Sequence, residues 1–350
     1  MNTLVDYDDA THSFVVMNNQ SAGEFVNIPY CLQDKDHKGV LFNEKSDNYG
    51  YKIFYKKNFV ENDIFLVIEK DLKSRIGWLF PASSIISDSH DYATNPHYCR
   101  YAFIAHFLLI HYEISADDIV SRDFAEIINK DFVDNNAIFF IYDKSLTKII
   151  PDFNVQNYYS SFYKYGYYLK NEEVNPEVLM PLANGKITIS KISQYFIGDK
   201  FLDKFFNFLF FEKYPIIRFH ILYQIIELLI EDILIFSLEN TIHSFKNKKL
   251  YARSLRERIS KIEKESDRIL LLIKWCDIEF DYTILHDRCN TFITTKGRPS
   301  FDFPESLYAF RNFVVHDFRH MTDDVETVKD VNYQLELFVL DLLNTYLHKI

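Results

Sequence analysis

Glycine and proline are scarce in this chain of 350 residues, which has 8 Gly and 9 Pro. So low a content argues against long disordered or low-complexity segments. The sequence contains neither a GxGxxG motif nor a GxxxxGK[ST] motif. A nucleotide-binding loop of either kind therefore has no support, and we expect no cofactor.

Cysteine is also rare, and the four cysteines form no CxxC pair: Cys31, Cys99, Cys276 and Cys289. No signal-peptide pattern is present at the N-terminus. Scattered cysteines without a secretory signal are typical of proteins from a reducing compartment, so we expect a cytoplasmic location.

A long uninterrupted hydrophobic run is missing as well. The most apolar segment, residues 225–238, is interrupted by Glu227, Glu231 and Asp232. It is also shorter than the roughly 20 residues that a membrane-spanning helix requires. We therefore expect a buried helix here and no membrane partner.

The formal net charge is −11, so nucleic acid would be repelled except at a local basic patch. Residues 245–261 form one such cluster, with Glu257 as the single acidic residue. Its cations are Lys246, Lys248, Lys249, Arg253, Arg256, Arg258 and Lys261. Two interpretations remain open, a footprint for the RNA backbone and the solvated start of a helix.

Aromatic residues are abundant at 17%, which predicts a large core. In the first half, residues 63–70 and 137–150 have the β-branched and aromatic character of strands. Residues 100–113 and 115–132 have helical patterns. We expect a mixed α/β domain with a sensing or regulatory role over residues 1–180, ending near the Asn-Pro pair in a polar stretch.

The second half, residues 181–350, has long helical periods throughout. Helices are expected over residues 201–214, 216–245, 251–276, 304–318 and 325–350. Such a succession predicts an all-α bundle of about five helices. The fold class of the whole chain is therefore α+β.

The segment FRNFVVHDF, residues 310–318, places two polar side chains in an apolar helical run. At about 100° per residue, Asn312 and His316 share one face, whereas Arg311 and His316 diverge by roughly 140°. One copy of this helix therefore makes a poor Arg–His site. Two copies packed across a two-fold axis would bring both pairs into one cleft.

This R-N-x3-H pattern, with the helix order around it, resembles the HEPN superfamily in its Apea-like and abortive-infection branches. The resemblance covers about residues 190–350 and includes YQIIELL, residues 223–229, on an early helix. It implies a metal-independent endoribonuclease in which the ribose 2′-OH attacks the adjacent phosphate. His316 would be the general acid and base, Arg311 would stabilise charge on the phosphoryl oxygens, and Asn312 would orient groups around them.

These residue types suit that chemistry. Imidazole, with an ordinary pKa of about 6.5, changes protonation near neutrality, and guanidinium stays charged and binds phosphate with a forked pair of donors. The resemblance implies an RNA substrate such as tRNA and a homodimer through the C-terminal bundle. The basic cluster offers contacts for the RNA backbone, namely Lys246, Lys248, Lys249, Arg253 and Arg256. The resemblance also implies a role in antiviral defence, with a phage-derived trigger or an antitoxin as partner.

Several alternatives remain open. The chain could be a non-catalytic HEPN-like scaffold, or the toxin of a toxin–antitoxin pair. Arg311 could instead pair with Asp317 or Glu305, and His316 could be an interior histidine with its hydrogen bonds satisfied. Glu227, inside the most apolar helix, needs a partner, and Arg311 or His316 could supply it.

Two pairs of residues have the chemistry of zinc ligands. They are His316 with His320, and His286 with Cys289. Neither pair has the spacing of a strong zinc motif, so we expect no metal site.

Overall fold

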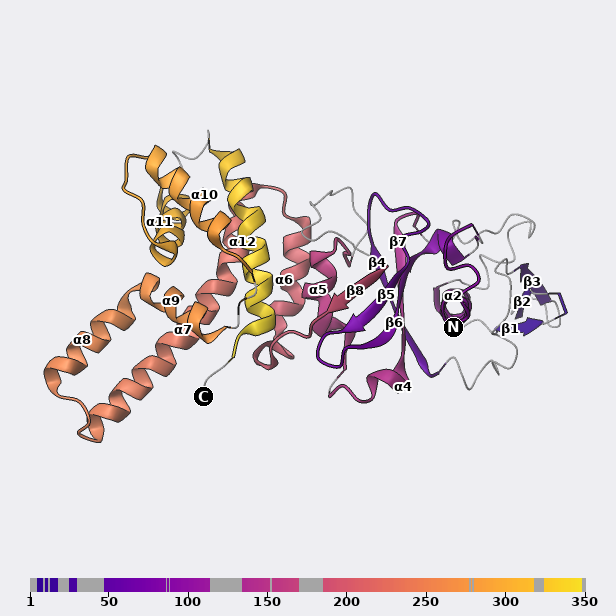
Figure 1. Ribbon diagram of the computed structural model, residues 1–350, viewed down its shortest axis with the longest axis horizontal. Coiled ribbons are helices and arrows are strands. Elements are labelled where there is room, and N and C mark those ends of the chain that lie inside the picture. Colours follow the sequence, from indigo (N-terminus) through magenta and orange to yellow (C-terminus); the bar gives the residue numbers. More distant parts are fainter. Residues whose placement is uncertain are drawn as a thin grey trace. The chain divides into compact units, whose positions relative to one another are not determined.

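The computed structural model describes residues 5–8, 10–11, 13–17, 25–29, 47–113, 134–169, 185–317 and 324–347, apart from residues 86, 88, 152, 277 and 279. The chain forms two compact units, residues 1–190 and residues 191–350 (Figure 1). The expected domain boundary at residues 180–181 lies outside the described residues. A mixed sheet followed by a helical region makes this an α+β protein.

The first unit is built on a five-stranded sheet with the strand order β4-β7-β6-β5-β8. Its strands are β4 (Tyr49–Tyr55), β5 (Phe65–Glu69), β6 (Ser74–Pro81), β7 (Ala137–Asp143) and β8 (Lys186–Ile189). All pairs are antiparallel except β5 with β8. A separate antiparallel sheet contains β1 (Val5–Asp8), β2 (Ser13–Met17) and β3 (Phe25–Pro29).

Short helices flank the larger sheet. They are η1 (Ala82–Ile85), α2 (Pro96–Leu108), the π-helical turn η2 (Leu109–Glu113), α4 (Lys144–Thr147), η5 (Val155–Tyr158) and α5 (Tyr159–Lys164). The expected helix over residues 100–113 begins earlier, because the Asn95 side chain accepts hydrogen bonds from the first-turn backbone. The expected strand over residues 137–150 ends at Asp143, which caps α4 by accepting from the Ser145 amide at 2.7 Å. The expected helix over residues 115–132 lies outside the described residues.

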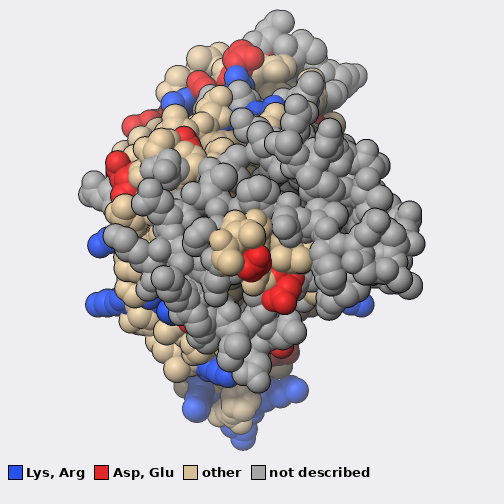
Figure 2. Space-filling model, turned by 90° about the vertical axis from the view of Figure 1, so that its right-hand side faces the viewer, with Lys and Arg blue, Asp and Glu red and all other residues tan. Residues whose placement is uncertain are grey.

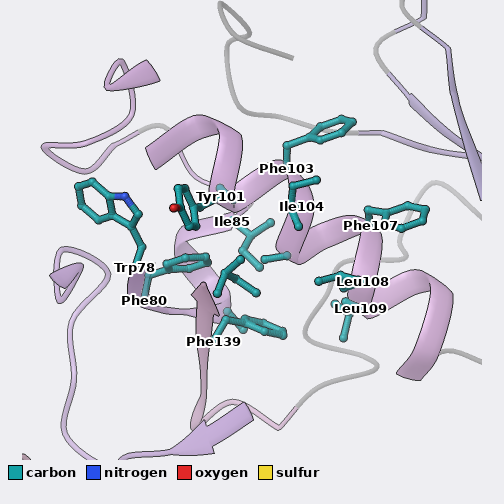
Figure 3. Close-up of a cluster of buried hydrophobic side chains, with 14 of the residues drawn as sticks. Trp78, Phe80, Ile85, Tyr101, Phe103, Ile104, Phe107, Leu108, Leu109 and Phe139 are labelled. Atoms are coloured by element: carbon teal, nitrogen blue, oxygen red, sulfur yellow. The ribbon is translucent and has the colours of Figure 1, made fainter. Parts of the chain in front are cut away.

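The sheet has an apolar core on each face. On one face, Trp78 and Phe80 of β6 and Phe139 of β7 pack against α2 (Figure 3). On the other face, Leu79 and Phe140 belong to a second cluster that includes α5. The alternation along β6 and β7 follows from the period of two in a strand, which sends successive side chains to opposite faces.

Gly77 on β6 lies where two strands approach closely. A Cβ atom there would be 2.2 Å from the carbonyl oxygen of Ile141 on the neighbouring strand. No side chain fits at this distance, so glycine is required for the β6–β7 pairing.

Every regular element of the second unit that the structure describes is a helix. They are η6 (Gln194–Phe196), α6 (Lys200–Phe211), α7 (Pro215–Lys246), α8 (Ala252–Glu263), α9 (Glu265–Trp275), α10 (Thr283–Thr295), α11 (Phe303–His316) and α12 (Val325–Thr345). The expectation of one helix over residues 251–276 is wrong, because Lys264 has extended backbone angles and separates α8 from α9. The sequence did not indicate α10. No helix in the described part of the chain is long and apolar enough to cross a membrane.

Helices α7 and α12 form the centre of this unit. Arg218 near the start of α7 makes a two-oxygen ion pair with Glu336 of α12, at 2.9 and 2.8 Å. Nearby, the Asn332 amide donates to the carbonyl of Pro215 at 2.6 Å. Both contacts attach the beginning of α7 to the middle of α12.

Tyr346, just after α12, joins three separate segments of the unit. Its hydroxyl donates to Asp232 of α7, and its carbonyl accepts from the Ser193 hydroxyl. Its ring packs with Trp275 at the end of α9 and is completely buried. The end of α12 is thereby fixed against α7, the end of α9 and the segment that contains Ser193.

Candidate functional site

Helix α11 carries the R-N-x3-H segment. The helix begins where the Asp302 carboxylate accepts a hydrogen bond from the Glu305 amide at 3.2 Å, and Pro304 lies in its first turn. Leu307, Phe310 and Val314 are fully buried on one face. Their spacing of three and four residues leaves the polar side chains on the remaining faces.

Arg311 is held by an acidic residue on another helix. One terminal nitrogen, Nη2, donates to Glu227 Oε1 at 2.9 Å, and Nη1 donates to Asn312 Oδ1 at 3.2 Å. The guanidinium carbon is 5.9 Å from the centre of the Tyr223 ring. Arg311 therefore pairs with Glu227, as one of the open alternatives had it, and its salt bridge is not to Asp317 or Glu305.

The surroundings keep Arg311 positively charged. Burial disfavours the charged guanidinium, but the hydrogen bond to Glu227 and the charges of Glu265 and Glu227 outweigh this, so the pKa of Arg311 is raised. Glu265, at the start of α9, accepts a hydrogen bond from the Tyr223 hydroxyl at 2.8 Å. Burial, the charge of Glu265 and this hydrogen bond raise the pKa of Tyr223 well above its ordinary value.

A second histidine lies close enough to this cluster to feel its charges, although the sequence pattern did not single it out. His220 lies about two helical turns before Glu227 on α7, so the two side chains share a face. Burial lowers the pKa of His220; Glu227 opposes this effect and Arg311 adds to it. The available signal was the i, i+7 spacing of His220 and Glu227 in a mostly apolar helix.

His316 is exposed in the last turn of α11, so the alternative of an interior histidine is wrong. Arg311 hydrogen-bonds to Glu227 and Asn312, and within the described residues no hydrogen bond joins it to His316. The structure therefore brings together Arg311, Asn312 and Glu227, and it leaves His316 apart on the same helix.

The five predicted RNA-binding cations, Lys246, Lys248, Lys249, Arg253 and Arg256, are all exposed around the turn between α7 and α8. Blue side chains gather at the lower end of the view in Figure 2, the level at which this turn lies in Figure 1. From Glu227 to Lys246, the last residue of α7, the distance along the helix is roughly 29 Å. The basic cluster and the Arg311 cluster are therefore two separate surfaces.

Of the two pairs considered for zinc, only His286 with Cys289 lies wholly within the described residues, and it joins no larger ligand set there. Cys289 is buried, which raises the pKa of its thiol, and a His286 ring nitrogen lies 2.9 Å from the Phe301 carbonyl oxygen. His320 lies outside the described residues. Among the described residues, no group of three or more potential ligands could hold a metal ion.

Comparison with known proteins assigns no family or function to the chain. No protein-family model matches the chain, and no curated protein or solved structure is significantly similar to it. Inferences about function therefore rest on the chemistry of the residues described above.

Proposed function

We propose that the chain is a metal-independent endoribonuclease effector, with a HEPN-like helical bundle in residues 191–350. Its role would be bacterial antiviral defence of the abortive-infection type. The observation that carries the proposal is on α11, where a firmly held guanidinium, Arg311, and an exposed imidazole, His316, lie on one helix. These are the groups needed to stabilise a phosphorane-like transition state and to transfer protons.

The proposed roles follow from the position of each group. Arg311 would bind the non-bridging phosphoryl oxygens, and Asn312, hydrogen-bonded to it, would orient the guanidinium. His316, open to solvent, would take the 2′-OH proton and return a proton to the leaving 5′-oxygen. Glu227 would hold Arg311 in place, and a phosphate would compete with this carboxylate for the cation.

The divergence of Arg311 and His316 on α11 favours a site completed by a second copy of the chain. In such a homodimer, His316 of one copy would face Arg311 of the other. His220 offers a further imidazole beside Arg311 within one copy, and the lowered pKa keeps it neutral near pH 7.

The remaining parts of the proposal concern partners. RNA, with tRNA as one candidate, would contact the basic cluster around the α7–α8 turn, where the cations are free to meet phosphates. Residues 1–190 would sense a phage-derived trigger or bind an antitoxin. A cytoplasmic location is part of the same proposal.

Two alternatives differ in what they predict. A non-catalytic HEPN-like scaffold would bind partners through the helical unit and cleave no RNA; the carboxylate already bound to Arg311 is the observation that favours it. A toxin of a toxin–antitoxin pair would cleave RNA and would stop growth when expressed without its partner.

The test is cleavage of tRNA and total RNA in the presence of EDTA by purified wild type, Arg311→Ala, His316→Ala and His220→Ala. His243→Ala is the matched control, because His243 is an exposed histidine on α7 far from Arg311. We expect wild type and the control to cleave, and Arg311→Ala and His316→Ala to lose at least a hundredfold in rate.

Inactivity of wild type in every condition would support the scaffold. Cleavage that EDTA abolishes would contradict the metal-independent mechanism. If His220→Ala is inactive and His316→Ala is not, the imidazole beside Arg311 in the same copy performs the chemistry.

A further inference from the structure

A regular row of side chains follows the outer face of α7. It alternates steps of four and three residues, the spacing of positions a and d in a coiled-coil helix. The row consists of Ile217, Ile221, Gln224, Leu228, Glu231, Ile235, Leu238, Ile242 and Phe245. Seven of these nine residues are apolar, and the last four form an unbroken apolar stretch.

Three of the four residues of that last stretch, Ile235 to Phe245, are exposed, and Leu238 is partly buried. Ile235 is 50% exposed, Ile242 is 45% exposed and Phe245 is 41% exposed. Helix α8 runs back beside this half of α7 (Figure 1). Ile233, on the opposite side of α7, is buried, and Thr241, which flanks the row between Leu238 and Phe245, is buried as well.

We propose that the stretch from Ile235 to Phe245, called the distal α7 face below, binds the same face of a second copy of the chain in antiparallel orientation. Apolar residues in heptad spacing fit another helix with the same spacing, and a second copy supplies one. The charges at the two ends of the face select the orientation.

A parallel pair would place Glu231 of one copy against Glu231 of the other, and the lysines at the end of α7 against each other. Like charges in these positions oppose association. An antiparallel pair sets the acidic end of each face, at Glu231, against the basic end of the other, where α7 ends at Lys246 and the exposed turn with Lys248 and Lys249 follows.

One antiparallel register satisfies both the apolar and the charged positions. It places Ile235 opposite Phe245 of the second copy and Leu238 opposite its Ile242, so every contact between a and d positions is apolar. Glu231 then faces the exposed turn just after α7 of the second copy, where Lys248 and Lys249 lie. Glu239, close to the two-fold axis, is the single like-charge contact in this register.

The short length of the face sets the expected strength. About three helical turns from each copy bury less than a standard interface of about 1,600 Å², so we expect a micromolar dimer. The flanking ion pairs are exposed, so added salt should weaken the dimer further.

This contact is separate from the proposed nuclease site and does not depend on it. In the antiparallel register the two Arg311 clusters would lie roughly 40 Å apart along the helices. A composite Arg311–His316 site would therefore use a different contact between copies. Arg253, Arg256 and Arg258 on α8 would remain available to an RNA backbone.

The first test is the concentration dependence of the molar mass of the full chain, measured by sedimentation velocity across the micromolar range. We expect Ile242→Glu to shift the dissociation constant at least tenfold and to halve the mass reached at high concentration. The matched control is Ile217→Glu, on the same helix and in the same row, with 48% exposure, but outside the paired stretch. This control should behave as wild type.

The second test exchanges charges. Glu231→Lys alone and Lys249→Glu alone should each dimerise more weakly than wild type, because these two residues face each other in the antiparallel register. An equimolar mixture of the two variants should form a heterodimer at least as strong as the wild-type homodimer, because both flanking contacts become attractive again.

Several outcomes would overturn the proposal. They are a wild-type mass that does not rise with concentration, equal effects of Ile242→Glu and Ile217→Glu, and a mixture no stronger than its components. Phosphatidylserine vesicles serve as a probe for a different occupant. If they bind wild type but not Ile242→Glu, in the absence of self-association, the distal α7 face docks on a membrane instead.

Discussion

Lys56, directly after β4, is a cation held almost entirely away from water. Its side chain is 5% exposed, its ammonium donates to the Tyr165 carbonyl at 3.0 Å, and it lies 4.5 Å from the centre of the Tyr167 ring. Burial lowers the pKa of Lys56 to about 8, and the charge of Asp63 opposes this only in part. The folded first unit therefore binds this proton less tightly than the unfolded chain does.

A specific pH dependence follows from this difference. Because the unfolded chain keeps the ordinary pKa of 10.5, the free energy of unfolding rises as the pH increases from about 8 toward that value. Below about pH 8 the burial of the charged Lys56 destabilises the fold by its full amount. A difference of this size corresponds to roughly 3 kcal/mol. We expect Lys56→Met to be more stable than wild type at pH 7 by about 1–2 kcal/mol, because the lost hydrogen bond offsets part of the gain.

The measurement is urea unfolding at pH 7 and at pH 9.5. The advantage of Lys56→Met should shrink at the higher pH, where wild-type Lys56 is mostly neutral. Lys148→Met, a change of an exposed lysine in the same unit, should show no such pH-dependent difference. An advantage that is equal at both pH values would contradict the assigned cause.

At the level of single residues, the sequence predicts the candidate site in part. The helical spacing of Arg311, Asn312 and His316 is a local property, so it can be derived from the pattern alone. A pairing of Glu227 with Arg311 is also one of the alternatives that its place in an apolar helix suggests, and the structure has this pair with the Glu227 side chain 44% exposed. Neither Tyr223 nor Glu265 can be assigned in this way, because their contacts depend on how α7, α9 and α11 pack.

Helices α7 and α12 are joined by the ion pair between Arg218 and Glu336, whose side chains are 15% and 6% exposed. Arg218 also donates to the carbonyls of Leu209 and Glu212, so the beginning of α7 is tied to α6 as well. A buried pair of this kind adds little over an apolar contact, but losing one partner leaves an uncompensated charge.

We expect Glu336→Gln to lower the free energy of unfolding by about 3 kcal/mol, since Arg218 would then be buried without its carboxylate. The double change Arg218→Met with Glu336→Leu should recover at least half of that loss. Glu326→Gln on the same helix is the control, because its pair with Lys329 is exposed and should contribute less than about 0.5 kcal/mol. Urea unfolding monitored by circular dichroism measures all three, and a double variant less stable than Glu336→Gln would contradict this account.

At the level of elements, the sequence predicts the long helices well, because α7, α11 and α12 show strong apolar periods. It does not predict the break at Lys264. The residues on both sides are good helix formers, so local propensity favours a continuous helix. Tertiary packing favours the break, because α8 packs along α7 whereas α9 contacts both α7 and α11.

The whole chain contains two tryptophans, and each reports on one unit: Trp78 on the first and Trp275 on the second. Because each unit has its own apolar core, we expect them to unfold in separate transitions. With Trp275→Phe as background, the fluorescence of Trp78 should report the shift caused by Lys56→Met and none from Glu336→Gln. With Trp78→Phe as background, the fluorescence of Trp275 should report the shift caused by Glu336→Gln and none from Lys56→Met. Identical curves from both reporters would show a single cooperative unit.

The change from a mixed strand-and-helix pattern to long helical periods is visible in the sequence, and the structure divides the chain into units of residues 1–190 and 191–350. The sheet order is not visible, because β8 pairs in parallel with β5, a strand far away in the sequence. Pairings of this kind depend on contacts across the whole first unit and leave no local signal.

The position of Tyr346 has a consequence for synthesis on the ribosome. The residues that cover α7, namely α12 and Tyr346, are translated long after α7 itself, whereas all strands of the first unit are complete before α7 emerges. Domains fold as units during translation, so the first unit can fold early, whereas the apolar surface of α7 stays exposed until α12 has been synthesised. A ribosome that stalls within α10 or α11 would hold a nascent chain with a long exposed apolar helix. Such chains are natural clients for chaperones, and slow translation of this stretch should lower the yield of the protein.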